Sequence, residues 1–411
     1  MIERTKFEAL LLSSAVSLRG FAVFLFLFVF LWALPAEAGE WSGRVALEER
    51  WFVEEPLLYE QLDNQFSLMI QPEYHHSWDG DRQSLTVVPF ARIDSVDRER
   101  SHFDLREFTW LKVGDGYEWR IGIRKLFWGV TESQHLVDII NQTDLVESPD
   151  GKEKLGQLMI NLALIRGSGT IDLFVLPGFR ERTFPGKKGR LRPSLPIDTN
   201  RVAYEASQEH VDLAARWSRS TEILDIGLSH FWGTSRDPLL LQGIDGEGQP
   251  LLFPRYDLIH QTGLDLQAIH ASWLWKMEAI RRSGQGSAYT AFTYGFEYTL
   301  SNFLNTGIDI GLISEHLYDD RGRKATTSFQ DDLMLGSRLA LNDIQGTEVI
   351  FGVIFDRHST ARLLNLEASQ RFGDKWRLTL EGRAFTAIPE EDTLFGLRQD
   401  DYIVVEWAWY F

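Results

Sequence analysis

The sequence predicts an all-β protein, a transmembrane antiparallel up-and-down β-barrel of about 18 strands, with about 16 as the lower bound. Three observations lead to this fold class. Apolar and polar residues alternate along most of the chain after residue 38, the connections between the alternating windows are short and long in turn, and the last strand, which ends in "EWAWYF", is strongly apolar on one face.

The first 38 residues have the organisation of an export signal. Three basic residues among the first 19 are followed by an unbroken apolar stretch, Phe21–Leu34, and by an Ala-x-Ala site that ends at Ala38. The apolar stretch is shorter than the ~20 residues of a spanning helix, which argues against an anchor that stays attached. We therefore expect residues 1–38 to be a cleaved signal peptide and 39–411 to be a single barrel domain.

Composition excludes several classes of protein. The chain has no cysteine, so a disulfide framework, thiolate metal sites and a cysteine nucleophile are excluded. A formal net charge of -17 argues against nucleic-acid binding, which requires a basic field. No apolar run after residue 38 is long enough for a transmembrane helix, so any membrane crossing must use strands.

The strand predictions rest on windows with a two-residue period. In residues 288–300, for example, aromatic residues occupy every second position, from Phe292 to Tyr298. The windows predict strands near 41–53, 64–78, 83–95, 101–113, 117–128, 157–166, 169–177, 209–218, 221–232, 255–268, 270–282, 288–300, 304–317, 328–342, 347–357, 361–372, 376–386 and 399–411.

The connections fall into two sets when taken alternately. Short, turn-like segments occupy one set: 79–81, 114–116, 167–168, 219–220, 301–303, 342–346 and 373–375. Every long connection belongs to the other: 129–156, 178–208, 233–254, 318–327 and 387–398. Outer-membrane barrels have short periplasmic turns and long external loops, so this alternation predicts such a barrel with both termini in the periplasm.

The final strand carries a recognisable signature. Apolar residues alternate up to the last position, at Ile403, Val405, Trp407, Trp409 and Phe411. We expect this face to contact lipid while the strand closes the barrel against the first one. The pattern resembles the terminal signature of Gram-negative outer-membrane β-barrel proteins. That resemblance implies location in the outer membrane and recognition by the barrel-assembly machinery.

A second segment, "GIRKLFWGVTESQHLVDIINQTD" from Gly122 to Asp144, is similar to a strand-and-loop pattern of several porin-like outer-membrane families. The family pattern has proline where this chain has Gln142. The resemblance implies a porin-like channel, and because many porins are trimers, a homotrimer is a candidate assembly.

Charged residues occupy the face opposite to the apolar one, so we expect them to line the lumen. Burying so many ions in a dry core would be costly, whereas a barrel of this size holds water. The predicted pore-lining residues are Arg92, Asp94, Asp104, Arg106, Arg120, Arg124, Asp212, Arg216, Asp309, Glu367, Arg371, Arg377, Glu381 and Arg383. A lumen plugged by paired charges and inward loops is the alternative interpretation.

Two long loops invite separate hypotheses. The basic loop 178–193 carries Arg180, Arg182, Lys187, Lys188, Arg190 and Arg192. It could fold inward as an anion-selecting constriction, bind lipopolysaccharide phosphates, or be a solvated surface loop. The 129–156 loop has apolar positions Leu136, Val137, Ile139, Ile140 and Leu145, which could form one or two helical turns either inside the lumen or on the rim.

Enzymatic motifs are absent from the sequence. It has no G-x-S-x-G elbow and no H-E-x-x-H helix. Histidines at 75, 76 and 358 could meet Ser or Asp residues across strands, but such scattered histidines are more often structural. Asp245 and Glu247 in "GIDGEGQ" could bind calcium, although carboxylates among glycines more often form a turn.

These observations together predict an outer-membrane porin-like channel for passive diffusion of small hydrophilic solutes, without a catalytic site, metal or cofactor. Its expected partners are membrane lipid, lipopolysaccharide and the permeating solutes. The alternatives are a plugged structural or docking barrel, an outer-membrane hydrolase with an active site at the rim and, with least support, a transporter for apolar solutes.

Overall fold

The computed structural model describes residues 39–411. The predicted signal peptide, residues 1–38, lies outside the described residues. Within 39–411 no helix is long and apolar enough to cross a membrane. The helical segments of this region are three short 3-10 turns, η1 (Phe303–Asn305), η2 (Gly322–Lys324) and η3 (Thr393–Leu397).

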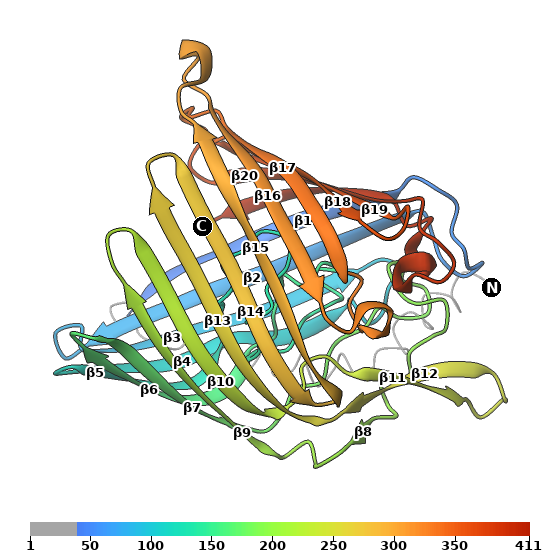
Figure 1. Cartoon of the computed structure of the whole chain (residues 1–411), viewed down its shortest axis with the longest axis horizontal. Coiled ribbons are helices and arrows are strands. Elements are labelled where there is room, and N and C mark those ends of the chain that lie inside the picture. The colour runs from blue at the N-terminus through green and yellow to red at the C-terminus, as the bar shows by residue number, and fades with distance from the viewer. Residues whose placement is uncertain (1–38) are drawn as a thin grey trace, which may run out of the picture.

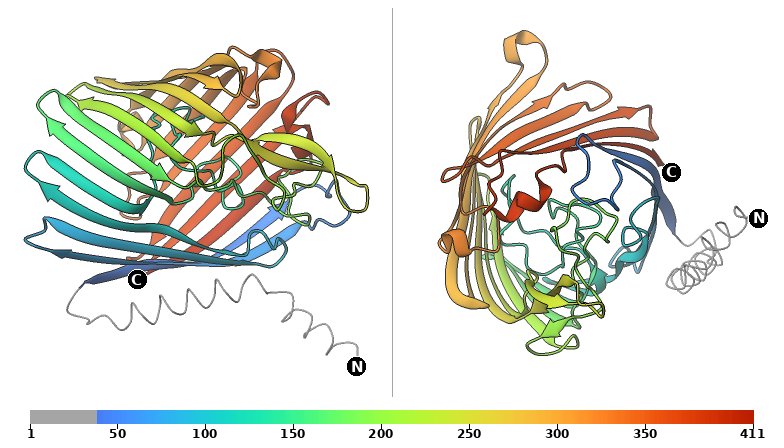
Figure 2. Two further views of the ribbon diagram at one scale, coloured as in Figure 1. Left: turned by 90° about the horizontal axis from the view of Figure 1, so that it is seen from below. Right: turned by 90° about the vertical axis from the view of Figure 1, so that its right-hand side faces the viewer.

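Eighteen strands form one antiparallel sheet that closes on itself, because β1 pairs with both β2 and β21 (Figures 1 and 2). The predicted closed barrel is therefore confirmed. The barrel strands are β1 (Glu40–Phe52), β2 (Asn64–Trp78), β3 (Gln83–Asp94), β4 (His102–Gly114), β5 (Tyr117–Arg124), β6 (Gln157–Arg166), β7 (Gly169–Pro177), β9 (Val211–Ser220), β10 (Leu224–Thr234), β13 (Leu258–His270), β14 (Trp273–Gly284), β15 (Gly286–Leu300), β16 (Asp309–Asp319), β17 (Asp331–Ala340), β18 (Glu348–Asp356), β19 (Arg362–Phe372), β20 (Trp376–Thr386) and β21 (Tyr402–Tyr410).

Alternation along each strand separates an apolar outer face from a polar inner face. On β21, Ile403 and Trp409 are 45% and 36% exposed, whereas Tyr402 and Ala408 are buried. Phe411 follows the same outward face and is also exposed. The outward orientation expected for the terminal aromatic residues is thus observed.

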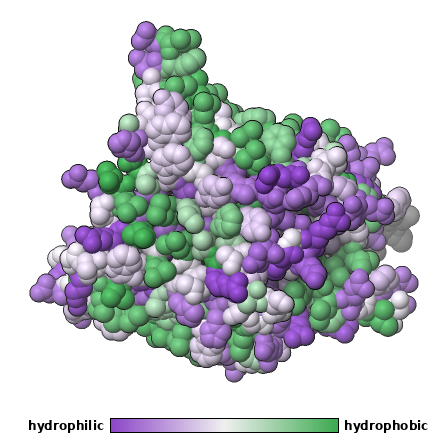
Figure 3. All heavy atoms as spheres, in the orientation of Figure 1, coloured by the Kyte–Doolittle hydropathy of each residue, from purple (hydrophilic) through white to green (hydrophobic). Residues whose placement is uncertain are grey.

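The exterior of the barrel is rich in large apolar side chains. Many are at least 40% exposed on the strands, among them Leu47, Phe66, Leu68, Phe108, Ile160, Leu228, Trp275, Tyr294, Leu335 and Phe351. Figure 3 shows apolar side chains over the strand face and hydrophilic ones gathered toward the right, where long connections lie. Apolar outside and charged inside is the arrangement of a barrel surrounded by lipid.

The two ends of the barrel differ as the connection lengths predict. The short-turn end has connections such as 115–116, 167–168 and 373–375, and the first strand begins and the last strand ends there. The long-loop end has the connections 125–156, 178–210, 235–257 and 387–401.

The shortest connection at the long-loop end joins β14 to β15. Only Gln285 separates β14 from β15, and glycines with positive φ, 108° at Gly284 and 76° at Gly286, flank it. A Cβ at Gly284 would lie 2.1 Å from the carbonyl oxygen of Leu258, so a residue without a side chain is required there.

Several predicted strand boundaries differ from the structure. Strand β5 ends at Arg124, four residues before the expected end, because the Asn141 side chain accepts a hydrogen bond from the Leu126 nitrogen at 2.9 Å and turns the chain inward. Strand β16 begins at Asp309 rather than 304, because Asn302, Leu304 and Asn305 have positive φ and form a turn. A small sheet of β8 (Ala203–Tyr204), β11 (Leu239–Ile244) and β12 (Pro250–Tyr256) was not predicted.

Candidate functional site

The barrel lumen is the candidate functional site, and two long loops enter it. Segments of 125–156 and 178–210 run across the interior when the barrel is viewed close to its axis (Figure 2, right). The contacts described below join these loops to inward-facing side chains on strands around the wall. Loop 125–156 therefore lies in the lumen rather than on the rim, and none of its described residues is helical.

Glu278 on β14 fixes the first part of loop 125–156. Its carboxylate, fully buried, accepts hydrogen bonds from the backbone nitrogens of Val130 at 2.7 Å, Thr131 at 2.9 Å and Val137 at 3.1 Å. Charge-assisted bonds of this kind satisfy backbone donors that would otherwise be buried unpaired. Glu315 on β16 does the same for the nitrogens of Glu132 and Ser133, at 2.8 and 2.9 Å.

His135 adds a titratable group to this attachment. Its Nδ1 lies 3.6 Å from Oε1 of Glu278. Burial lowers the pKa of His135, but the close negative charge of Glu278 outweighs burial and raises the pKa above its ordinary 6.5.

Apolar residues of the same loop pack on the inner wall. Ile139 and Ile140 join a buried cluster with Phe174, Phe231 and Ile259. Val137 packs in a second cluster with Ile280 and Tyr289. The loop is thus held by burial of apolar surface as well as by hydrogen bonds.

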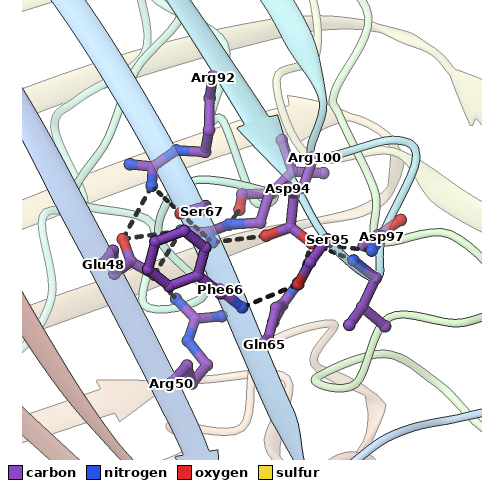
Figure 4. Close-up of polar contacts among 12 residues, drawn as sticks. Glu48, Arg50, Gln65, Phe66, Ser67, Arg92, Asp94, Ser95, Asp97 and Arg100 are labelled. Atoms are coloured by element: carbon purple, nitrogen blue, oxygen red, sulfur yellow. Dashed lines mark hydrogen bonds and ion pairs between the residues drawn. The ribbon is translucent and has the colours of Figure 1, made fainter.

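On the opposite side, a charge cluster centred on Glu48 joins β1, β3 and the loops (Figure 4). Arg92 and Arg100 donate to Glu48 at 3.0 and 2.8 Å. Arg92 also binds Glu147 of loop 125–156 at 2.8 Å, and Arg100 binds Asp94 at 3.0 Å. All five side chains are nearly inaccessible to solvent, so each charge depends on its partners.

A neighbouring cluster of ion pairs connects both long loops to β4. Arg106 lies 2.8 Å from Asp144 and 2.9 Å from Asp104, while Arg180 of loop 178–210 lies 2.9 Å from Asp104. Burial alone would raise the pKa of Asp144, but the nearby His102 side chain and the charge of Arg106 hold this pKa well below the usual range.

The other predicted pore-lining residues also occupy inward register positions. Arg216 pairs with Asp265, Asp212 with Arg236, and Arg120 with Glu118 and Asp172. Arg124 donates to Asn161, Arg377 to Ser369, and Glu381 accepts from the Tyr402 hydroxyl. Asp309 accepts from the Asn302 nitrogen at the short-turn end, and Arg371 is exposed near that end. Their role in a pore stays a prediction.

Three of the four arginines of the basic loop, Arg180, Arg182 and Arg190, pair with carboxylates. Arg182 lies 2.6 Å from Asp237, and Arg190 lies 2.7 Å from Asp400 with its guanidinium over the Phe52 ring. Arg192 donates to backbone carbonyls. Lys187 and Lys188 are exposed.

An open space remains between the tip of loop 125–156 and the wall formed by β19–β21 and β1–β4. This cavity has a volume of about 240 Å³, and Arg44, Lys152, Glu367, Glu381 and Glu406 are among its lining residues. The loop tip bridges to the wall, because Asp150 pairs with Arg383 at 2.6 Å and Lys152 pairs with Glu367.

A second cavity, of about 680 Å³, lies at the long-loop end between β16–β18 and residues 389–393. His358 lines it and binds Asp331 at 2.9 Å, but Asp331 also binds His316 and Arg357, and the Ser359 hydroxyl bonds to Asp356. His75 contacts Thr86, and His76 stacks with Trp78. These contacts form ion pairs and packing rather than the Ser-His-Asp arrangement of a hydrolase.

Residues 39–411 contain no group of three or more His, Cys, Asp or Glu side chains that could hold a metal ion. Asp245 accepts hydrogen bonds from the nitrogens of Glu247 and Gln249, at 2.9 and 2.8 Å, and so stabilises its own turn.

Comparison with known proteins identifies the fold class. No protein-family model and no curated protein matches the sequence. The structure is similar to OccK11 (OpdR) of Pseudomonas aeruginosa, with a TM-score of 0.51, 9% identity and coverage of 91% of this chain and 95% of that one. It is also similar to Wzi of Escherichia coli, an outer-membrane protein involved in group 1 capsule assembly, with a TM-score of 0.50, 8% identity and coverage of 89% and 83%.

The closed sheet, the apolar exterior and the charged interior define a transmembrane β-barrel fold, which is similar to that of porin-like outer-membrane proteins. At such low identity the two neighbours support the fold alone.

Proposed function

We propose that the protein is a channel for passive diffusion of small hydrophilic solutes across the outer membrane. One observation carries the proposal: a cavity of about 240 Å³, lined by partly exposed charges of both signs, lies between the inward loop and the barrel wall. Charged walls of this kind admit hydrated solutes and select among them by their size and by their interaction with the electric field of the wall. The function requires no reaction and no cofactor.

The same proposal sets the orientation and the partners. The short-turn end with both termini faces the periplasm, and the long loops face the cell exterior. Lys187 and Lys188, the exposed cations of the basic loop, are available to lipopolysaccharide phosphates. The terminal strand Ile403–Phe411 is the signal for the barrel-assembly machinery, and a homotrimer is the candidate assembly.

Conductance of the purified protein in planar bilayers tests the proposal. We expect step-like openings of uniform size in symmetrical salt. Wild-type protein that is folded, inserted and persistently silent would overturn it.

The buried ion pairs of the inward loop favour a second candidate, a barrel that is closed at rest. Loop-tip variants separate the two candidates, since Asp150→Asn with Lys152→Met removes the bridge to Arg383 and Glu367. A silent wild type whose double variant conducts would identify a plugged barrel. A wild type that already conducts, with larger steps in the double variant, supports the channel.

A further inference from the structure

We infer that the permeation path is off-centre, follows the wall formed by β19–β21 and β1, and selects small cations, both inorganic ions and organic solutes with an ammonium group. This inference rests on the proposed channel function and adds the route and the charge of the solutes. It is carried by the unequal burial of the inner wall and by the charges that line the two cavities.

Burial of inward-facing side chains differs between the two sides of the barrel. Asp212, Phe231, Glu278 and Thr293, on β9, β10, β14 and β15, are completely buried. Inward-facing residues of β18–β20, such as Ile350, Asn365, Glu381 and Arg383, keep part of their surface accessible. The inward loops therefore fill one side of the lumen and leave the other side partly open.

Both cavities lie on the less covered side. The smaller one is bounded by β19–β21, β1–β4 and the loop tip at 147–153. The larger one lies at the ends of β16–β18, beside residues 389–393. On the wall between them, inward-facing Ile354, Leu363 and Phe385 are register partners and form one apolar layer.

Carboxylates outnumber cations among the accessible charges of the smaller cavity. Glu48, Glu147, Arg50 and Arg92 belong to the buried cluster, and Arg106 is paired with Asp104 and Asp144. The lining carboxylates outside that cluster are Asp150, Glu153, Glu367, Glu381 and Glu406; the lining cations outside it are Arg44 and Lys152. Arg383 contacts Asp150, Glu367 and Glu381, and Lys125 lies 3.4 Å from Glu153, so these cations reduce the excess to one carboxylate.

The larger cavity also has an excess of negative charge among its lining residues. Its lining carboxylates are Asp319, Asp320, Asp331, Asp356, Glu391 and Asp392, and its lining cationic side chains are Arg323 and His358. Arg321 and Arg357 neutralise Asp319 and Asp331. A path with an excess of negative charge between low-dielectric walls concentrates cations and excludes anions.

Reversal potentials across a salt gradient test the inference. We expect wild-type channels to prefer K⁺ over Cl⁻. Glu381→Gln and Glu406→Gln should each lower the ratio of K⁺ to Cl⁻ permeability by about threefold, because each removes one charge a few ångströms from the path in water. Glu118→Gln is the matched control, because Glu118 lies on β5 against Arg120 and does not line either cavity. It should leave the ratio unchanged.

The absence of cysteine permits a second measurement on the same positions. A cysteine placed by Glu406→Cys should be modified faster by a cationic than by an anionic thiosulfonate reagent. Channels that conduct without cation preference, or that respond to Glu118→Gln as strongly as to Glu381→Gln, would overturn the inference and leave the channel function standing. Silent wild-type protein would overturn the channel function itself.

Discussion

The carboxylate of Glu278 lies 2.7 Å from the backbone nitrogen of Val130, a residue 148 positions earlier in the chain. Glu278 belongs to a barrel strand and Val130 to the inward loop. Through this bond and its neighbours at Thr131 and Val137, one buried side chain fixes how the loop enters the lumen.

Replacement of Glu278 should therefore release the loop without opening the barrel. In Glu278→Ala the backbone donors of Val130, Thr131 and Val137 lose their acceptor, at a cost of about 1–3 kcal/mol for each buried donor left unsatisfied. We expect noisier and larger conductance steps and faster proteolysis within residues 129–137. Glu348→Ala, at an exposed inward position of β18, is the control. Equal proteolysis of both variants would contradict the prediction.

The Glu48 cluster should respond to loss of a single partner. Arg92→Met leaves Glu48 and Glu147 without a shared cation, and breaking a buried pair in this way costs about 3–5 kcal/mol. We expect a lower urea midpoint for unfolding in detergent micelles. Arg82→Met removes an exposed ion pair with Asp79 and should change the midpoint little. Equal decreases of the urea midpoint in the two variants would contradict the prediction that the buried ion pair stabilises the barrel more than the exposed one.

Attachment of loop 125–156 should weaken as pH rises. The folded-state pKa of His135 is raised above its ordinary 6.5 by Glu278, so its stabilising contribution is complete below that value and is lost as pH rises through the folded pKa. Hydrogen exchange of residues 129–137 should accelerate as pH rises above 6.5, beyond the intrinsic base catalysis. His135→Gln should abolish this extra dependence, and a variant that retains it would assign the effect to another group.

The terminal residue should matter for assembly more than for the finished barrel. The Phe411 backbone exchanges hydrogen bonds with Gly43 at 3.1 Å in both directions, and its ring lies 5.2 Å from that of Trp409. Deletion of Phe411 should lower the yield of heat-modifiable barrel in cells. Protein refolded from urea should close normally, because the β1–β21 register extends from Phe52 to Arg44 without it. Equal yields in cells would contradict the assembly role.

The barrel fold could be predicted from the sequence because the orientation of side chains on a strand and the length of each connection depend on residues that are close together in the chain. A two-residue period fixes which side chains face outward, and the alternation of short and long connections fixes the two ends. Departures occurred where one residue changed the backbone path, as Asn141 did at the end of β5 and Leu304 did before β16.

The contents of the lumen were less predictable for a physical reason. Inward orientation of Arg92 and Glu381 follows from strand parity, but their partners are distant in sequence. Glu278 and Glu315 were missed because they bind backbone nitrogens, which every residue has and which leave no signature in the sequence. A carboxylate at an inward position of a predicted strand, such as Glu278, is the one signal that could have suggested an anchoring point.

Loop 125–156 contacts β3–β4, β14–β16 and β19–β20, three sectors of the wall that do not adjoin one another. It therefore acts as an internal brace and resists flattening of the cylinder under lateral pressure from the bilayer. A barrel whose lumen is widened by trimming this loop would also be mechanically softer, so its diameter would vary with the thickness and tension of the membrane around it.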